Sequence, residues 1–140
     1  MNAPLYTRDI LRLAASIPHL GRFEELEGSA ERRSPTCGSR MRVAVELDEE
    51  RRVTGLKQAV EACAFGQASA ALMGVAAKGR NATEIRAALA GVDAWLNGDD
   101  RAVTSWPGLD VLAPARSRKG RHGAILLPFR TLLAAIEEAK

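Results

Sequence analysis

Two neighbouring segments with strand periodicity, joined by a polar turn, constrain the fold of this chain more than any other feature. Apolar and polar side chains alternate over residues 40–48, which predicts a strand with one face against a core. A polar turn follows at residues 48–51, and residues 52–62 predict a second, antiparallel strand. Residues 31–33 are predicted to add a third. Such a sheet needs a layer of helices to cover its apolar face.

Helical periodicity flanks this hairpin on both sides. The predicted helices span residues 6–17, 67–78, 83–97 and 123–139, with a short helical turn over residues 106–112 that ends at Pro114. A proline inside a helix costs about 3 kcal/mol, so the last helix is predicted to begin only a few residues before Pro128. The order of elements predicts an α+β fold, in which a small antiparallel sheet of about three strands packs against several helices. Residues 1–140 are expected to form a single domain.

Composition narrows the class of protein. Hydrophobic residues make up 46% of the chain and charged residues 26%, as in ordinary globular proteins. No apolar run reaches the roughly 18 residues that a membrane-spanning helix needs, so no membrane association is expected. The chain start lacks the pattern of a signal peptide, and two distant cysteines do not form a disulfide framework. We expect a cytoplasmic protein with reduced thiols.

Charge alone does not identify the partner. The net charge is +3, and residues 116–121 form a basic cluster. Aromatic residues make up only 4% of the chain, and none lies among these bases as a stacking platform for nucleic acid would require. A solvated basic loop is the simplest interpretation. A docking patch for an acidic protein is the alternative.

Both cysteines occupy positions suited to chemistry. Cys37 lies between Thr36 and Gly38 in a polar loop, where burial in a core is less natural than a role as a ligand or reactive thiol. Cys63 precedes a predicted helix whose first amides point back towards it, which favours the thiolate. The alternative for Cys63 is a small buried apolar side chain.

One histidine is a candidate third ligand. His122 is predicted to lie just ahead of the last helix, so it can meet Cys37 and Cys63 as ligands of zinc or iron. The alternative is a surface histidine. His19 has no Cys or Glu at metal-motif spacing and is assigned to the surface.

The phrases around the two cysteines resemble those of the U-type iron–sulfur scaffolds, the family of IscU, SufU and the N-terminal domain of NifU. That family carries Pro-x-Cys-Gly-Asp and Gly-Cys-x-x-x-x-Ala-Ser. The matching residues are Pro35, Cys37 and Gly38 in the first phrase, and Cys63, Ala68 and Ser69 in the second. The segment Arg121-His122-Gly123-Ala124-Ile125-Leu126 resembles the third site, a His-Cys pair followed by a small residue and Ile-Leu. The resemblance spans nearly the whole chain and implies the fold of these scaffolds.

The resemblance also implies a ligand set, from which this chain departs twice. Ser39 stands where the family has an aspartate, and Gly123 stands where it has its last cysteine. The implied metal ligands are therefore Cys37, Cys63, His122 and Ser39. This set suits zinc with an open position better than an iron–sulfur cluster on one chain, although a homodimer could supply four thiolates. The chaperone-docking Leu-Pro-Pro-Val-Lys stretch of the family is missing as well.

Three functional hypotheses follow. The leading one is a scaffold or metal-carrying accessory protein of iron–sulfur cluster assembly, which is not an enzyme and receives sulfur from a cysteine desulfurase. The second is a degenerate scaffold fold that serves as a regulatory or protein-interaction subunit. The third is a thiol enzyme with Cys37 or Cys63 as nucleophile and His122 as base, for which the sequence supplies no evident oxyanion hole.

Overall fold

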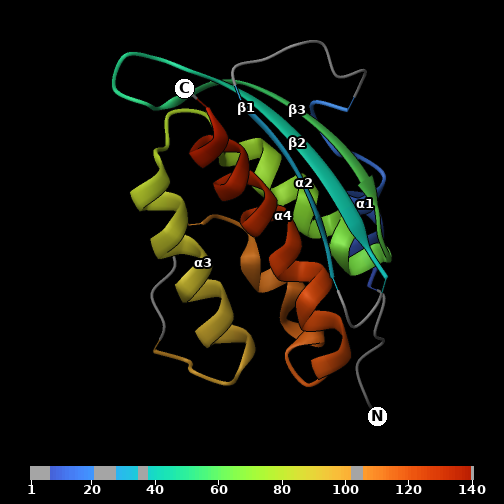
Figure 1. Ribbon diagram of the computed structural model, residues 1–140. Helices are drawn as coiled ribbons and strands as arrows, with labels where there is room; N and C mark the ends of the chain where they lie inside the picture. Colours follow the sequence, from blue (N-terminus) through green and yellow to red (C-terminus); the bar gives the residue numbers. More distant parts are fainter. Residues whose placement is uncertain (1–6, 21–27, 35–37, 102–105, 140) are drawn as a thin grey trace.

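Three antiparallel strands form one sheet with the helices on one of its faces (Figure 1). The computed structural model describes residues 7–20, 28–34, 38–101 and 106–139. The strands are β1 (Gly28–Arg33), β2 (Arg40–Leu47) and β3 (Val53–Glu61), in the order β1-β2-β3. The helices are α1 (Arg8–Ala14), α2 (Ala64–Ala76), α3 (Ala82–Leu96), the 3-10 helix η1 (Leu109–Ala115) and α4 (Lys119–Glu138). The predicted α+β class is confirmed.

The predicted hairpin is present, in the expected antiparallel register. The alternating apolar residues of β2 are all buried: Met41, Val43, Val45 and Leu47. β1 begins at Gly28, three residues before the predicted strand. A Cβ atom at Gly28 would overlap the carbonyl oxygen of Ala135, so glycine allows α4 to lie directly against the start of β1.

The structure shows that the predicted start of the last helix is wrong. α4 begins at Lys119, which makes Pro128 its tenth residue instead of a residue of its first turn. Proline has no N–H to donate to the carbonyl four residues earlier, and its ring crowds the preceding turn. In that turn the Ile125 carbonyl accepts a hydrogen bond of 2.6 Å from the Ser69 hydroxyl on α2. α4 packs against β1, β2, α2 and α3, and this burial stabilises a helix that its own sequence disfavours.

Other helix boundaries shift by a few residues. α1 is shorter than predicted, and the predicted contribution of Tyr6 lies outside the described residues. α2 begins at Ala64 and ends at Ala76, whereas residues 67–78 are predicted. Pro114 does not end the short helix, because η1 runs from Leu109 to Ala115 and contains it.

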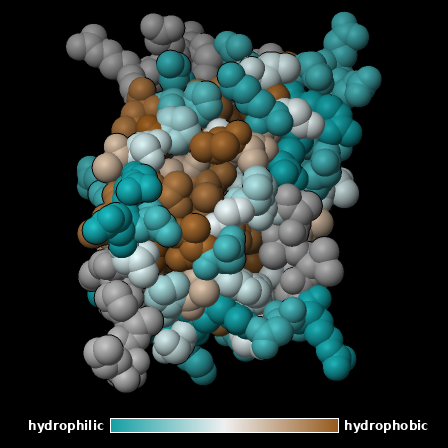
Figure 2. All heavy atoms as spheres, turned by 180° about the vertical axis from the view of Figure 1, so that it is seen from behind, coloured by the Kyte–Doolittle hydropathy of each residue, from teal (hydrophilic) through white to brown (hydrophobic). Residues whose placement is uncertain are grey.

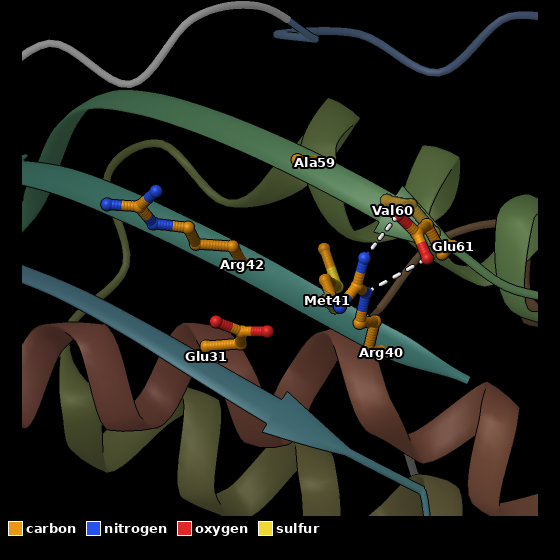
Figure 3. A pocket seen from close by; sticks show the side chains of 7 residues that line it. All are labelled: Glu31, Arg40, Met41, Arg42, Ala59, Val60 and Glu61. Carbon is orange, nitrogen blue, oxygen red and sulfur yellow. Dashed lines mark hydrogen bonds and ion pairs between the residues drawn. The ribbon is translucent and has the colours of Figure 1, made fainter. Parts of the chain in front are cut away.

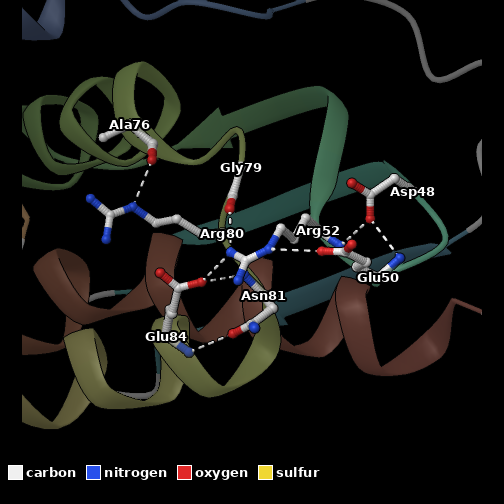
Figure 4. Close-up of polar contacts among 8 residues, drawn as sticks. All are labelled: Asp48, Glu50, Arg52, Ala76, Gly79, Arg80, Asn81 and Glu84. Atoms are coloured by element: carbon white, nitrogen blue, oxygen red, sulfur yellow. Dashed lines mark hydrogen bonds and ion pairs between the residues drawn. The ribbon is translucent and has the colours of Figure 1, made fainter.

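Two arginines of the β2–β3 hairpin tie the sheet to the helices. Arg51 donates to the carbonyls of Ile136 and Ala139, at 2.9 and 3.1 Å, and so caps the C-terminal end of α4. Arg52 donates to the Glu84 carboxylate at 2.6 Å and to the Gly79 carbonyl at 2.7 Å (Figure 4). The hydrogen bond from Arg52 lowers the pKa of Glu84. Glu84 in turn completes a capping box with Asn81 at the start of α3.

A buried amide holds the turn that follows α1. Gln58, fully buried on β3, donates from Nε2 to the carbonyl of Pro18 at 2.8 Å. Its main-chain N–H donates to the carbonyl of His19 at 3.0 Å. The sequence assigns His19 to the surface, but its side chain is half-buried, and burial lowers its pKa. The turn therefore docks against the sheet through polar contacts.

The rear face of the molecule carries an apolar centre. Figure 2 shows hydrophobic side chains gathered near the middle of this face, with hydrophilic ones around them. The large apolar side chains that are most exposed among the described residues are Leu11, Leu20 and Val75. Leu11 lies on α1 and Val75 on α2, two helices that pack on each other. None of the helices in the described part of the chain has the length and hydropathy to cross a membrane.

Candidate functional site

The sheet brings the described ends of the two cysteine segments to the same end of its strands. The register pairs Arg40, the first residue of β2, with Glu61, the last residue of β3. Cys63 follows Glu61 by two residues, and the Cys37 loop ends just before Arg40. Cys37 itself lies outside the described residues, as do Pro35 and Thr36. The ends of its loop are nevertheless fixed beside the start of α2.

Main-chain hydrogen bonds close the base of the Cys37 loop. Ser34 donates its N–H to the carbonyl of Ser39 at 2.8 Å, and Gly38 donates to the carbonyl of Ser34 at 3.2 Å. Gly38 has φ of +70°, a left-handed conformation that glycine adopts without strain. Ser39, a predicted metal ligand, is only 4% exposed. The two described ends of the loop, Ser34 and Ser39, are therefore hydrogen-bonded to each other and buried.

An ion pair joins the ends of β2 and β3. The guanidinium of Arg40 donates two hydrogen bonds to the carboxylate of Glu61, at 2.9 and 2.8 Å (Figure 3). These hydrogen bonds and the attraction between the charges raise the pKa of Arg40 and lower that of Glu61. The pair borders a shallow hollow of about 380 Å³, which Glu31, Arg42 and Ala59 also line. Opposite charges at paired strand ends are a sequence signal that the predictions above do not use.

Cys63 occupies the junction that the sequence predicts. It is the N-cap of α2, with extended backbone (φ −66°, ψ 172°), and its carbonyl accepts the first helical hydrogen bond, from Gln67 at 2.9 Å. Its thiol makes no capping hydrogen bond and forms no disulfide. The side chain is half-buried and packs against the core on one side. Cys63 is neither a fully buried core residue nor a fully exposed one.

His122 does not lie in a loop, which corrects the predicted position. It is the fourth residue of α4 and only 8% exposed, so the surface alternative is also wrong. Its Nε2 atom lies 3.0 Å from the carbonyl oxygens of Ala115 and Arg116 at the end of η1. Carbonyl oxygens only accept, so Nε2 donates in these contacts, and Nδ1 is the ring nitrogen left to bind a ligand. A metal bound by His122 in this conformation would bind Nδ1.

The first turns of α2 and α4 pack on each other. A Cβ atom built on Gly66 would lie 3.3 Å from the Cβ atom of Ala124. Gly66 is one turn after Cys63, and Ala124 is two residues after His122, so both candidate ligands lie near this helix contact. Among the described residues, no three His, Cys, Asp or Glu side chains are placed to hold a metal ion. Because Cys37 is outside that part of the chain, the predicted ligand set stays a prediction.

The basic segment is not the solvated loop that the sequence suggests. Arg116 forms an ion pair with Asp100 at 2.6 Å, donates to the carbonyl of Trp95 at 2.8 Å and stacks 4.9 Å over the ring of Trp95. Residues from Lys119 onwards belong to α4. Only part of the cluster remains as an exposed charged surface.

Comparisons with known proteins show the family of this chain. The sequence profile described as "NifU-like N terminal domain" matches residues 5–94, which include both cysteines. The chain belongs to this family. A structure described as the N-terminal part of a nitrogen-fixing NifU-like protein from Brucella abortus is 30% identical, with a TM-score of 0.87 over 96% of this chain and 93% of that one. The resemblance seen in the sequence is confirmed.

Two further solved structures share the fold. One is a putative iron–sulfur cluster assembly scaffold protein for the SUF system from Fervidobacterium islandicum, with 19% identity, a TM-score of 0.81 and coverage of 94% of this chain and 96% of that one. The other is a hypothetical protein with 21% identity, a TM-score of 0.74 and coverage of 92% and 94%. No curated protein matches the chain.

Proposed function

We propose that this chain is an assembly scaffold or metal carrier for iron–sulfur clusters, with Cys37 and Cys63 as the thiolates that hold the cargo. Its role is to bind and pass on metal and sulfur, not to catalyse turnover. The observation that supports the proposal is the pairing of Arg40, which follows the Cys37 loop, with Glu61, which precedes Cys63, in a chain of the NifU-like family. The NifU-like family and the description of one structure with the same fold, as a scaffold for iron–sulfur cluster assembly, support the same role.

The remaining donors come from the surrounding elements. Nδ1 of His122 is proposed as a third ligand and the hydroxyl of Ser39 as a weak fourth, because both residues lie close to the cysteine segments. Two thiolates with one imidazole suit zinc or iron with an open position. Holding a complete cluster with such a set calls for further thiolates, and a homodimer would supply them.

Sulfur would arrive as a persulfide on a cysteine of a desulfurase. A thiolate of this chain attacks the outer sulfur, the S–S bond breaks, and the partner leaves as a thiolate while the persulfide stays here. This exchange needs neither an oxidant nor a reductant. The half-buried Cys63, with no capping hydrogen bond to its thiol, fits the attacking role.

Metal binding by the purified chain tests the proposal. Cys37→Ala and Cys63→Ala are each expected to lower the stoichiometry of bound iron or zinc, measured by elemental analysis after anaerobic loading. Thr54→Ala, an exposed change on β3, serves as the control and is expected to bind metal like the unmodified chain. Unchanged stoichiometry in both cysteine variants would refute the proposal.

One feature favours the regulatory alternative. Gly123 offers no ligand where the resembling family has its last cysteine. A chain of this kind that binds a desulfurase but retains no metal in the loading experiment would be a regulatory subunit. Binding measured together with metal analysis separates the two functions.

A further inference from the structure

We infer that the cysteine end of this molecule docks an acidic protein surface through a basic rim formed by Arg33, Arg118, Lys119 and Arg121. The inference rests on the proposed function, because a scaffold must receive sulfur or metal from a partner that approaches this end. It adds the chemistry of the surface that the partner presents.

The four rim residues lie at the same end of the molecule. Arg33 ends β1 and pairs in register with Arg40, beside the Cys37 loop, and its charge helps lower the pKa of Glu61. The helix α4 runs alongside β1 in the opposite direction, since Gly28 lies against Ala135 (Figure 1). From Gly28 to Arg33 the strand covers about 17 Å, and from Ala135 back to Lys119 the helix covers about 24 Å. Both elements therefore end near the candidate site.

The rim charges are available to a partner. Arg33, Arg118 and Lys119 are exposed, and Arg121 is half-buried. Among the described residues, no carboxylate forms an ion pair with any of the four, whereas Arg40, Arg52 and Arg116 are all paired. Arg116 is excluded from the rim for this reason.

The opposite end of the molecule carries the opposite charge. The β2–β3 turn contains Asp48, Glu49 and Glu50, and α4 ends with Glu137 and Glu138, all of them exposed. The arginines of that turn are engaged with α4 and α3. A partner with an acidic surface is therefore attracted to the cysteine end and repelled from the other, which orients the encounter.

The side chains around the rim favour a protein over a nucleic acid. Phe65, Trp106 and Phe129 are buried, and the half-buried Trp95 is covered by Arg116. The described residues thus supply no exposed aromatic ring on which a base could stack. Charge is the recognition element that remains, and it suits carboxylates on a folded surface.

Charge reversal with a matched control tests the rim. The double variant Arg118→Glu with Lys119→Glu is compared with Arg86→Glu and Arg130→Glu, two exposed arginines away from the rim, so that net charge changes equally. Binding of a fluorescent oligoglutamate peptide is measured by anisotropy at low and at physiological ionic strength. The rim variant is expected to lose about tenfold in affinity at low salt and the control less than about twofold, with both effects smaller at high salt.

Three results would overturn the inference: equal losses in both variants, no binding of the peptide by the unmodified chain, or tighter binding of an oligothymidylate of matched charge. The last result would assign the rim to nucleic acid. Metal loading of the same variants is measured in parallel and is expected to be unchanged. Failure of metal loading in the unmodified chain would refute the scaffold function and leave the result on the rim intact.

Discussion

The hydrogen bond from Ser69 to α4 makes a strong prediction about stability. Both residues of the bond are fully buried, and its length of 2.6 Å indicates a well-formed contact. Ser69→Ala removes the donor. The Ile125 carbonyl, which lies in the turn that Pro128 disturbs, then loses its hydrogen bond to α2. Losing a buried partner costs about 1–3 kcal/mol. For a chain of 140 residues this corresponds to a fall in Tm of about 3–10 °C.

Thr131→Val is the matched comparison. Thr131 is also fully buried, and its hydroxyl donates to the Leu127 carbonyl at 2.7 Å within α4. Both carbonyls face an N–H of α4, but the Thr131 hydroxyl bonds its own helix whereas Ser69 joins α2 to α4, so loss of the Thr131 hydroxyl is expected to cost less. Urea unfolding followed by far-UV circular dichroism gives both free energies. A Ser69→Ala variant no less stable than Thr131→Val would refute the reasoning.

The proline supplies a second check on the same bond. Pro128→Ala restores an N–H in α4 and allows the turn to straighten. The restored N–H bonds the Ala124 carbonyl, and the straighter turn brings the next carbonyl, that of Ile125, towards the Phe129 N–H, so Ser69→Ala should cost less in the Pro128→Ala background than in the unmodified chain. Additive effects in this double-mutant cycle would show that the hydroxyl does not compensate for the proline.

The remaining predictions concern the end of α4, the Arg40–Glu61 ion pair and the proposed metal ligands. Arg51→Ala should lower the free energy of unfolding by about 1 kcal/mol, since the C-terminal carbonyls of α4 lose a cationic donor; urea unfolding measures this. Arg40 lowers the pKa of Glu61 below 4.5, so their pair stabilises the fold above that pH and the effect is lost as pH falls through the lowered pKa. The difference in urea midpoint between the unmodified chain and Glu61→Gln should therefore disappear in acid. Chelation of bound metal should lower Tm but leave the far-UV spectrum intact, because the core forms without metal. Ser39→Asp with Gly123→Cys should increase the visible absorbance of cluster retained after anaerobic reconstitution, because it adds two anionic ligands.

The sheet could be predicted from sequence because a hairpin is a local pattern. Alternation places Met41, Val43 and Val45 on one face whatever packs there. The start of α4 cannot be predicted from the cost of Pro128 within the helix alone. The contacts that stabilise α4 despite Pro128 come from Ser69 and from the elements that bury the helix. These residues are distant from Pro128 in the sequence.

In the candidate site, too, local sequence patterns are predictable and tertiary contacts are not. The two cysteine phrases single out two segments, and the register between β2 and β3 brings the described ends of those segments to the same end of the sheet. The position of His122 could not be read from Arg121 and Gly123, because its burial depends on the carbonyls of η1. The Arg40–Glu61 pair was missed although its signal, opposite charges at the two ends of a hairpin, was in the sequence.

The tertiary contacts of His122 bear on what kind of site this chain can build. Since Nε2 donates to two carbonyls, the imidazole is held in one orientation and offers a single lone pair, at Nδ1. A fixed imidazole would select metal by geometry, whereas a free surface histidine would not. His122→Gln places an amide donor near the position of Nε2 for the carbonyls but removes the ring lone pair. A loss of metal affinity in that variant without a loss of stability would therefore separate ligation from the structural role of the ring.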